Sequence, residues 1–260
     1  MKISIITATY NSGRTLQRTI DSVREQDYAT IEHIIIDGGS TDETLRIIEK
    51  NKSSISVFVS EKDNGIYDAL NKGIKLATGS VIGFLNSDDV YYNQQVISEI
   101  VTHFESKKAD VVYGSIVYQT KQKMSNKIIR YWESNEFDSR SLRFGWMPPH
   151  PTMYCLKEIY DKYGLYDDSY KIAADYDFIL RVFKEPLVVK SYIPFVLVKM
   201  DVGGVSNNSL SNIYKKTIED YKAIKKNKIG GISTLILKNF RKLNQFVAFR
   251  GKILPCSTCL

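Results

Sequence analysis

The sequence predicts an α/β fold organised around a doubly wound, mostly parallel β-sheet. Strand and helix patterns alternate over the first 115 residues, as the crossover connections of a parallel sheet require. Each expected strand is a short apolar run, which is typical of strands buried on both faces. The chain has 260 residues, 43% of them hydrophobic, so it is long enough to bury a full core.

Five strands and four helices account for this first segment. The strands are expected at residues 3–7, 33–36, 57–59, 81–85 and 110–114. The helices between them are marked by apolar residues at helical spacing, namely Leu16, Ile20 and Val23; Leu45, Ile47 and Ile48; Ala69, Leu70, Ile74 and Leu76; and Val96, Ile100 and Phe104. The order is therefore βαβαβαβαβ.

Composition narrows the class of protein. Three cysteines are too few for a disulfide framework, and Cys256 and Cys259 lack the second pair that a zinc site needs. There is no run of eighteen apolar residues, and the first residues lack the basic segment of a signal peptide. We therefore expect a cytoplasmic protein that can associate with the inner face of the cell membrane.

The net charge of +7 is concentrated near the end of the sequence. Residues 215–252 contain eleven Lys or Arg and two acids, a charge of +9, so the other residues together carry −2. Apolar residues repeat at helical spacing from Ile232 to Val247, with Lys238 and Arg241 among them, which predicts a basic amphipathic helix. We expect residues 206–260 to form a helical tail that contacts a membrane surface, or alternatively packs on the core or on a second subunit. Nucleic acid is not an expected partner, because the basicity lies outside the predicted core.

Polar segments follow three of the expected strands at the point where each ends. They are Thr7–Asn11, Asp37–Ser40 and Asn86–Asp89. Ligands of open α/β sheets lie outside the carboxyl ends of the strands, so the three segments predict one site. Asp88 and Asp89 form an oxygen-rich, doubly negative pair suited to a divalent cation and its phosphates, although the same acids could cap the next helix. The sequence thus indicates a metal-dependent enzyme that acts on a nucleotide.

Two common nucleotide-binding motifs are absent. No GxGxxG follows the first strand, which disfavours a dinucleotide-dependent oxidoreductase, and no GxxxxGK[ST] occurs, which disfavours a P-loop phosphotransferase.

Four blocks of the sequence resemble glycosyltransferase family 2, whose members have the GT-A fold. The blocks are IITATYNSGRTLQRTIDSV, IDGGSTDET, SEKDNGIYDALNKGIKLATGSVIGFLNSDD and AADYDFILR, in the family's order. The resemblance implies a nucleotide-sugar-binding half at residues 1–115 and an acceptor-side half of the same catalytic domain at residues 116–205.

The resemblance also implies where the donor nucleotide binds. Thr7, Thr9, Tyr10 and Asn11 match the segment beside the nucleotide base, with Thr9 and Tyr10 as the contacts. Asp37 stands where the first Asp of the family's DDGS turn meets the uracil. Gly38 replaces the second Asp, so this turn has one carboxylate instead of two. Two further donor-side residues, which could approach the sugar or the diphosphate, are Asp63 and Lys72.

The metal site and the catalytic base are implied in the same way. Asp88 and Asp89 match the family's DxD-type motif, in which one acid contacts the ribose and the second helps to bind Mn²⁺ or Mg²⁺ on the diphosphate. Asp175 falls where the family's ED motif places its general base, although Ala174 replaces the Glu. Asp177 is the second choice for the base, with pairing to Arg181 four residues later as its alternative role.

The Pro-rich segment 144–152 is expected on the acceptor side. Its three prolines exclude a helix or a central strand. Trp146 could stack on a sugar and His150 could bind a hydroxyl or a phosphate, while a buried, rigid loop with Trp146 in the core is the alternative.

These observations predict an inverting, metal-dependent glycosyltransferase that moves one sugar from a nucleotide-sugar donor, a UDP-sugar, to a glycan or lipid-linked acceptor in surface polysaccharide synthesis. Residues 179–183 lack the QxxRW of processive synthases, which favours single addition. The alternatives are a sugar-phosphate nucleotidyltransferase and an inactive nucleotide-binding scaffold. The oligomeric state is not predicted.

Overall fold

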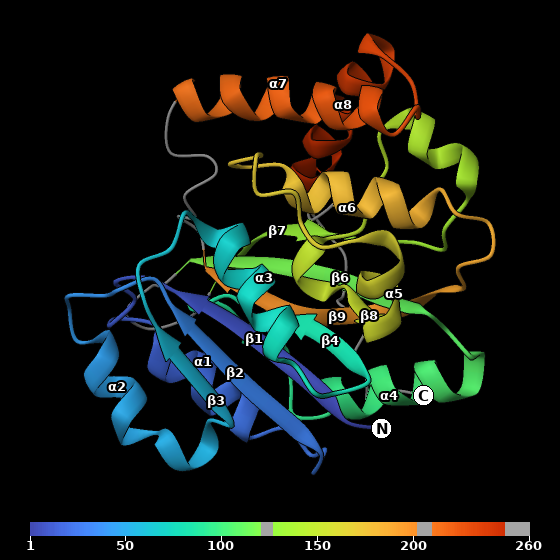
Figure 1. Cartoon of the computed structure of the whole chain (residues 1–260). Helices are drawn as coiled ribbons and strands as arrows, with labels where there is room; N and C mark the ends of the chain where they lie inside the picture. The colour runs from blue at the N-terminus through green and yellow to red at the C-terminus, as the bar shows by residue number, and fades with distance from the viewer. Residues whose placement is uncertain (121–126, 202–209, 248–260) are drawn as a thin grey trace.

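The computed structural model describes residues 1–120, 127–201 and 210–247, and these residues form one large mixed sheet covered by helices (Figure 1). The order along the sheet is β3-β2-β1-β4-β8-β6-β9-β5, and β7 pairs with β6. The strands are β1 (Ile3–Thr9), β2 (Ile31–Asp37), β3 (Val57–Ser60), β4 (Val81–Phe84), β5 (Val90–Tyr91), β6 (Val111–Thr120), β7 (Lys127–Trp132), β8 (Tyr154–Leu156) and β9 (Lys190–Asp201).

Helices connect the strands of the first half, as the sequence predicts. These helices are α1 (Leu16–Arg24), α2 (Thr44–Lys50), α3 (Ile66–Leu76) and α4 (Val96–Lys107). Strands β1, β2, β3 and β4 are parallel neighbours, and the register aligns Thr9 with Asp37 and Asp37 with Ser60. The carboxyl ends of these strands therefore meet at one edge of the sheet.

The second half of the sheet is mixed, although the five strands predicted from the sequence all run in the same direction. Strand β8 runs antiparallel between β4 and β6, and the fifth predicted strand, β6, is parallel to β9 instead of lying beside β4. Close packing makes room for β8. A Cβ on Gly83 of β4 would lie 2.0 Å from the ring of Tyr154, so only glycine admits that ring.

Each face of the sheet has its own apolar core. Alternation along β1 sends Ile5 into a cluster with α4, while Ile6 packs in a larger cluster with α3, α5 (Lys157–Tyr163) and α6 (Ala174–Phe183). One 3₁₀ turn, at Ser139–Phe144, leads into the Pro-rich segment, and another, at His150–Thr152, ends it. A third 3₁₀ turn follows α2 at Lys52–Ser54.

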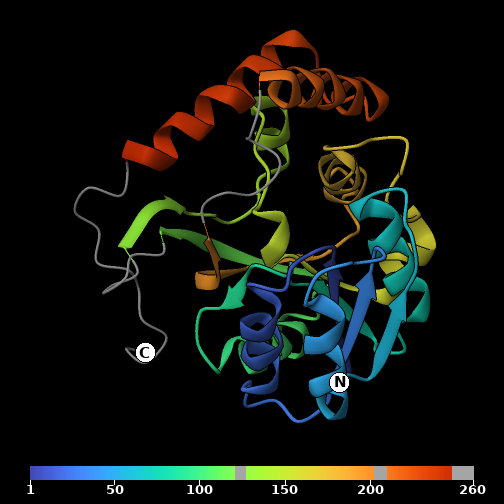
Figure 2. The ribbon, with the colours of Figure 1, turned by 90° about the vertical axis from the view of Figure 1, so that its left-hand side faces the viewer.

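The tail folds onto the α6 side of the catalytic core as α7 (Leu210–Lys226) and α8 (Ile232–Val247), the outer layer in Figure 2. The Glu219 carboxylate accepts backbone N–H bonds at 2.8–2.9 Å from the turn that precedes α6, and Lys238 forms a buried ion pair of 2.5 Å with Asp220. Arg241 donates to the Phe144 carbonyl. Lys238 therefore lies buried between the tail and the core, whereas Arg241 remains exposed. The prediction for Cys256 and Cys259 lies outside the described residues.

Candidate active site

The ends of β1, β2 and β3 are joined by hydrogen bonds around Asp37. Its carboxylate is fully buried and accepts four bonds: from the N–H groups of Gly39 and Ser40 at 3.1 and 3.0 Å, and from the hydroxyls of Ser40 and Ser60 at 2.5 and 2.7 Å. Asp37 thus holds the turn after β2 and ties it to β3. A carboxylate used in this way is poorly placed to meet a nucleotide base.

The β1 segment divides between the core and the site. Thr7 is buried, with its hydroxyl 3.0 Å from the ring of His33, so its side chain faces the sheet interior and the expectation that Thr7 lies beside the base is corrected. Thr9 Oγ1 is buried and has no hydrogen-bond partner in the described part of the chain. The ring of Tyr10 is 62% exposed. Thr9 and Tyr10 therefore remain suited to contact a ligand.

Asn11 links the turns after β1 and β2. Its φ of 49° lies in the left-handed region, which Asn tolerates better than most residues. Its N–H donates to Ser40 Oγ at 2.8 Å, and its side-chain oxygen accepts the Thr41 N–H at 2.9 Å. Asn11 thus fixes the path of the chain beside Tyr10.

The acid pair follows β4 at the same edge of the sheet. Asp89 is fully buried, and its Oδ2 accepts a bond of 2.8 Å from the Asn86 amide. Burial, and then the charge of Asp88, raise the pKa of Asp89 well above its usual range. Neither acid caps α4, because β5 intervenes and the helix begins only at Val96. The helix-cap alternative is therefore wrong.

The donor set at Asp89 suits a cation. Its Oδ1 is buried with no hydrogen-bond partner among the described residues, and a bound cation would satisfy it and favour the ionised form. No group of three or more His, Cys, Asp or Glu placed to hold a metal occurs in residues 1–120, 127–201 and 210–247. A cation here would complete its coordination with ligand or water oxygens.

Asp175 lies at the start of α6, beside α3. Its Oδ1 accepts the Tyr176 N–H at 2.8 Å and lies 3.2 Å from the Tyr67 hydroxyl, which also donates to the Ile172 carbonyl at 2.7 Å. No hydrogen bond within the described chain engages Oδ2. The carboxylate is half-buried. Oδ1 is thus held by the start of α6 and by Tyr67 of α3, whereas Oδ2 is not held in this way.

His150 packs between Phe84, the last residue of β4, and Tyr166. Its ring stacks on Phe84 with centroids 5.5 Å apart, and its Nε2 lies 2.7 Å from the Tyr166 hydroxyl. Burial lowers the pKa of His150, while the nearby charge of Asp175 opposes this shift. The acid pair follows the same strand four residues after Phe84.

Comparison with known proteins identifies the family. Residues 4–163 match Glycosyl transferase family 2. A PGL/p-HBAD biosynthesis glycosyltransferase of Mycobacterium bovis is 30% identical over 220 residues, which cover 83% of each chain. An uncharacterized glycosyltransferase of Mycobacterium tuberculosis is 30% identical over 224 residues, covering 79% of this chain and 77% of that protein. The chain belongs to glycosyltransferase family 2. The sugar-phosphate nucleotidyltransferase and inactive-scaffold alternatives are set aside.

Solved structures confirm the GT-A type of fold. S. aureus TarS in complex with UDP superposes with a TM-score of 0.66 at 21% identity, covering 96% of this chain and 72% of that one. The Pyrobaculum calidifontis mannosyltransferase PcManGT, in complex with GDP-Man and Mn²⁺, superposes with a TM-score of 0.65 at 14% identity, covering 95% and 73%. This glycosyltransferase therefore has the predicted fold.

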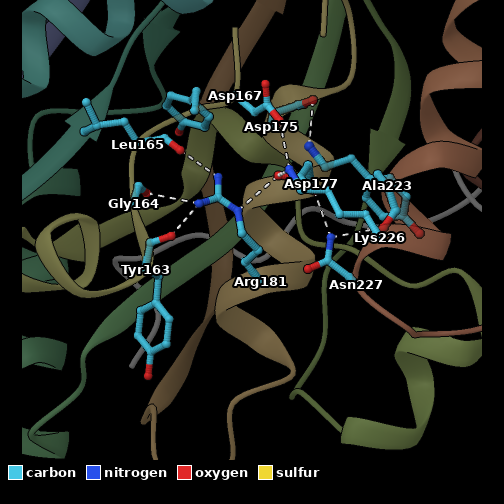
Figure 3. A network of polar contacts seen from close by, with 12 residues as sticks. Tyr163, Gly164, Leu165, Asp167, Asp175, Asp177, Arg181, Ala223, Lys226 and Asn227 are labelled. Carbon is cyan, nitrogen blue, oxygen red and sulfur yellow. Dashed lines mark hydrogen bonds and ion pairs between the residues drawn. The ribbon is translucent and has the colours of Figure 1, made fainter. Parts of the chain in front are cut away.

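Asp177 of this glycosyltransferase, the second choice for the base, belongs to a buried polar network. It is fully buried and bonded to three groups: Arg181 Nε at 3.0 Å, Lys226 Nζ at 3.2 Å and Asn227 Nδ2 at 2.9 Å (Figure 3). The alternative pairing with Arg181 is thus confirmed, and Lys226 and Asn227 tie α7 to α6. The Arg181 guanidinium also donates to the carbonyls of Tyr163, Gly164 and Leu165.

Trp146 lies in the core, so the expectation that it stacks on a sugar is corrected in favour of the buried alternative. Its indole N–H donates to the Asn135 side chain at 2.8 Å, and its ring packs against Tyr113, Phe137 and Phe183. Aromatic residues of a rigid loop fill a core readily, because they bury a large apolar area.

The other donor-side residues lie around the start of α3. Lys72 pairs with Glu61 at 2.9 Å and Asp68 at 3.2 Å. Asp63 accepts the Gly65 N–H at 3.0 Å and lies over the turn after β2. The sequence reading missed Tyr67 and Tyr166 as neighbours of Asp175 and His150. The only signal for Tyr67 was its place in the GIYDALNKG block.

Proposed function

We propose that this enzyme transfers a single sugar from a UDP-sugar to a hydroxyl of a glycan or lipid-linked acceptor, with inversion at the anomeric carbon. The observation that carries this proposal is Asp175, whose Oδ1 is fixed by Tyr176 while Oδ2 is left for a substrate proton. The acid pair lies beyond Phe84, which His150 joins to the surroundings of Asp175.

Asp175 acts as the general base in this proposal. The acceptor hydroxyl has a high pKa and must lose its proton as the anomeric carbon becomes electron-deficient. Attack from the face opposite the nucleotide inverts the configuration. Because burial lowers the pKa of His150, its ring is neutral near pH 7. A neutral ring can orient the acceptor through a hydrogen bond and does not form an ion pair with Asp175.

Asp89, with Asp88, would hold Mn²⁺ or Mg²⁺ in this enzyme. Such an ion, when bound, would stabilise the charge that develops on the leaving diphosphate. The buried, unpartnered Oδ1 of Asp89 supports this assignment. Further support comes from PcManGT, whose complex contains Mn²⁺.

The relatives support the substrate classes. TarS complexes contain UDP and UDP-GlcNAc, which favours a uridine donor here. The mycobacterial relative acts in PGL/p-HBAD biosynthesis, which favours an acceptor destined for a surface glycoconjugate.

A thermal-shift panel of UDP-, GDP-, dTDP- and CMP-sugars, with and without Mn²⁺, tests the donor and the metal together. The melting temperature should rise most for a UDP-sugar with Mn²⁺, because a ligand that binds only the folded state stabilises it by mass action. Asp89→Asn should abolish the metal-dependent part of the shift.

The same variant gives a pH signature without any ligand. A carboxyl whose folded pKa is raised binds its proton more tightly in the folded state, so Asp89 lowers stability as pH rises above its unfolded pKa. Metal-free Asp89→Asn should therefore be more stable than wild type near pH 7. This difference in stability should become smaller near pH 3. The proposal is contradicted if none of the nucleotide-sugars raises the melting temperature in the presence of Mn²⁺. It is also contradicted if Asp89→Asn responds to the metal as wild type does.

We further propose that the tail contacts an anionic membrane surface through the outer face of α8. Ile232, Ile236 and Phe240 recur every four residues and are exposed, with Phe240 61% exposed, while Lys238 faces the core. Exposed apolar rows of this kind favour an interface between water and lipid. In the described residues, no helix is long and apolar enough to cross a bilayer.

Liposome flotation tests this contact with the full chain. Vesicles that contain anionic lipid should carry wild type upward, whereas Ile236→Ser/Phe240→Ser should remain with the soluble fraction. Ser233→Ala, at an exposed polar position of the same helix, is the matched control. Equal partitioning of wild type and the double variant ends the proposal, and concentration-dependent mass in solution would indicate a second copy on this face.

A further inference from the structure

We propose that the carboxylate that recognises the uracil of the donor is supplied by Asp63, from the loop between β3 and α3, and not by Asp37 of the β2 turn. This inference rests on the proposed uridine donor. It makes Asp63 a specificity-determining residue for the nucleobase.

The carboxylate oxygens of Asp37 are already occupied by hydrogen bonds from its own turn and from the end of β3. Its four hydrogen bonds come from Gly39, Ser40 and Ser60, and no part of its side chain is exposed. To contact a base, Asp37 would have to give up bonds that hold the ends of β2 and β3 together. Each such bond in a buried site is costly to leave unmade.

Gly38 leaves its side-chain position open, and Asp63 occupies it. A Cβ on Gly38 would lie 2.5 Å from Asp63 Oδ2 and 3.1 Å from its Cγ, so a side chain at position 38 would displace the Asp63 carboxylate. Gly38 does not have a positive φ, so its backbone conformation does not require glycine. The turn after β2 has Gly38 where the family has its second Asp. The carboxylate of Asp63, from the loop between β3 and α3, lies in the place of that missing side chain.

Asp63 is oriented and still has an oxygen to offer. Its Oδ1 accepts the Gly65 N–H at 3.0 Å, and in the described chain Oδ2 makes no hydrogen bond. The Gly38 N–H donates to the Thr9 carbonyl at 2.9 Å, so Oδ2 lies beside the end of β1, where the exposed ring of Tyr10 follows. An aromatic face and a carboxylate edge are thus both available to a planar base.

The chemistry of uracil fits this pair. Its N3–H is a donor between two carbonyl acceptors, and a carboxylate can accept it in a charge-assisted hydrogen bond. Cytosine has an unprotonated nitrogen at the same position and would meet the carboxylate with repulsion. Asp63 would therefore favour uridine over cytidine nucleotides.

Calorimetric titration of UDP and of UDP methylated at N3 isolates this one contact. Wild type should bind UDP about 10- to 100-fold more tightly than the methylated ligand, the range expected for a hydrogen bond to a charged group. Asp63→Ala should weaken UDP binding by a similar factor and bring the ratio between the two ligands close to one. Glu61→Gln, which removes a charge from the same loop, should keep the wild-type ratio.

A relocated carboxylate provides the second arm. Gly38→Asp combined with Asp63→Gly returns the acid to the β2 turn without the clash, and should recover part of the UDP affinity and of the ratio. A full ratio in Asp63→Ala, or equal losses for both ligands, overturns the inference, the latter because it indicates a diphosphate or sugar contact. Failure of wild type to bind UDP appears in the first titration and overturns the uridine donor itself.

Discussion

Asp175→Asn is expected to lower the turnover of the cognate donor and acceptor by about 100- to 10,000-fold, the range that general base catalysis supplies. The amide keeps an oxygen for the Tyr176 N–H, so the start of α6 should be unchanged, but it cannot take the acceptor proton. Donor affinity with Mn²⁺ should change little, because the acid pair lies in the segment between β4 and β5, away from α6 in the sequence. Initial rates of nucleotide release, with calorimetric donor binding, separate the two effects.

Asp168→Asn is the matched control for this experiment, because Asp168 is an exposed acid seven residues before Asp175. It should keep both rate and affinity. If Asp175→Asn retained transfer, or lost donor binding together with rate, the assignment of the base would be wrong.

Asp177→Ala is expected to destabilise the fold by about 3–5 kcal/mol, since it leaves the largely buried Arg181 guanidinium without its carboxylate. The same change removes the acceptor for Asn227 and weakens the contact between α7 and α6. Urea unfolding followed by circular dichroism measures the loss. At urea concentrations where the variant remains folded, its affinity for the donor should equal that of wild type.

Lys226→Ala is the control for the Asp177 network. Its side chain is 46% exposed, so its ion pairs with Asp177 and Asp167 should contribute less than about 1 kcal/mol. A stable but inactive Asp177 variant would instead place Asp177 in the chemistry. Together, the Asp175 and Asp177 variants distinguish a reacting carboxylate from a structural one only two residues away.

The fold of the first half could be predicted because its signals are local. Each of β1 to β4 is an apolar run, and each following helix shows apolar residues at helical spacing, so periodicity places these elements along the chain. The second half depends on contacts between distant segments. Strand β8 has three residues and β5 has two, and β8 takes its place only because Gly83 accepts the ring of Tyr154.

The sequence predicts which residues lie near the candidate site better than it predicts what each side chain does there. The parallel register brings Thr9, Asp37 and Ser60 to one edge, as expected from strand ends. Spacing cannot reveal that Asp37 is saturated by its own turn, or that Asp177 faces α7 rather than substrate. Similarly, the position of Lys238 in the sequence suggests a basic outer surface, but its buried pair with Asp220 places it inside.

The three bonds from the turn before α6 to Glu219 limit how this enzyme can be recombined with its relatives. That turn, at residues 171–173, leads directly to Asp175, so the tail helps to hold the proposed base in place. A chimaera that exchanges only the tail to redirect the enzyme to another surface would separate Glu219 from its partners. The smallest exchangeable unit therefore runs from the turn before α6 through α8, and a crossover at the junction near residue 205 should yield folded but slow enzymes.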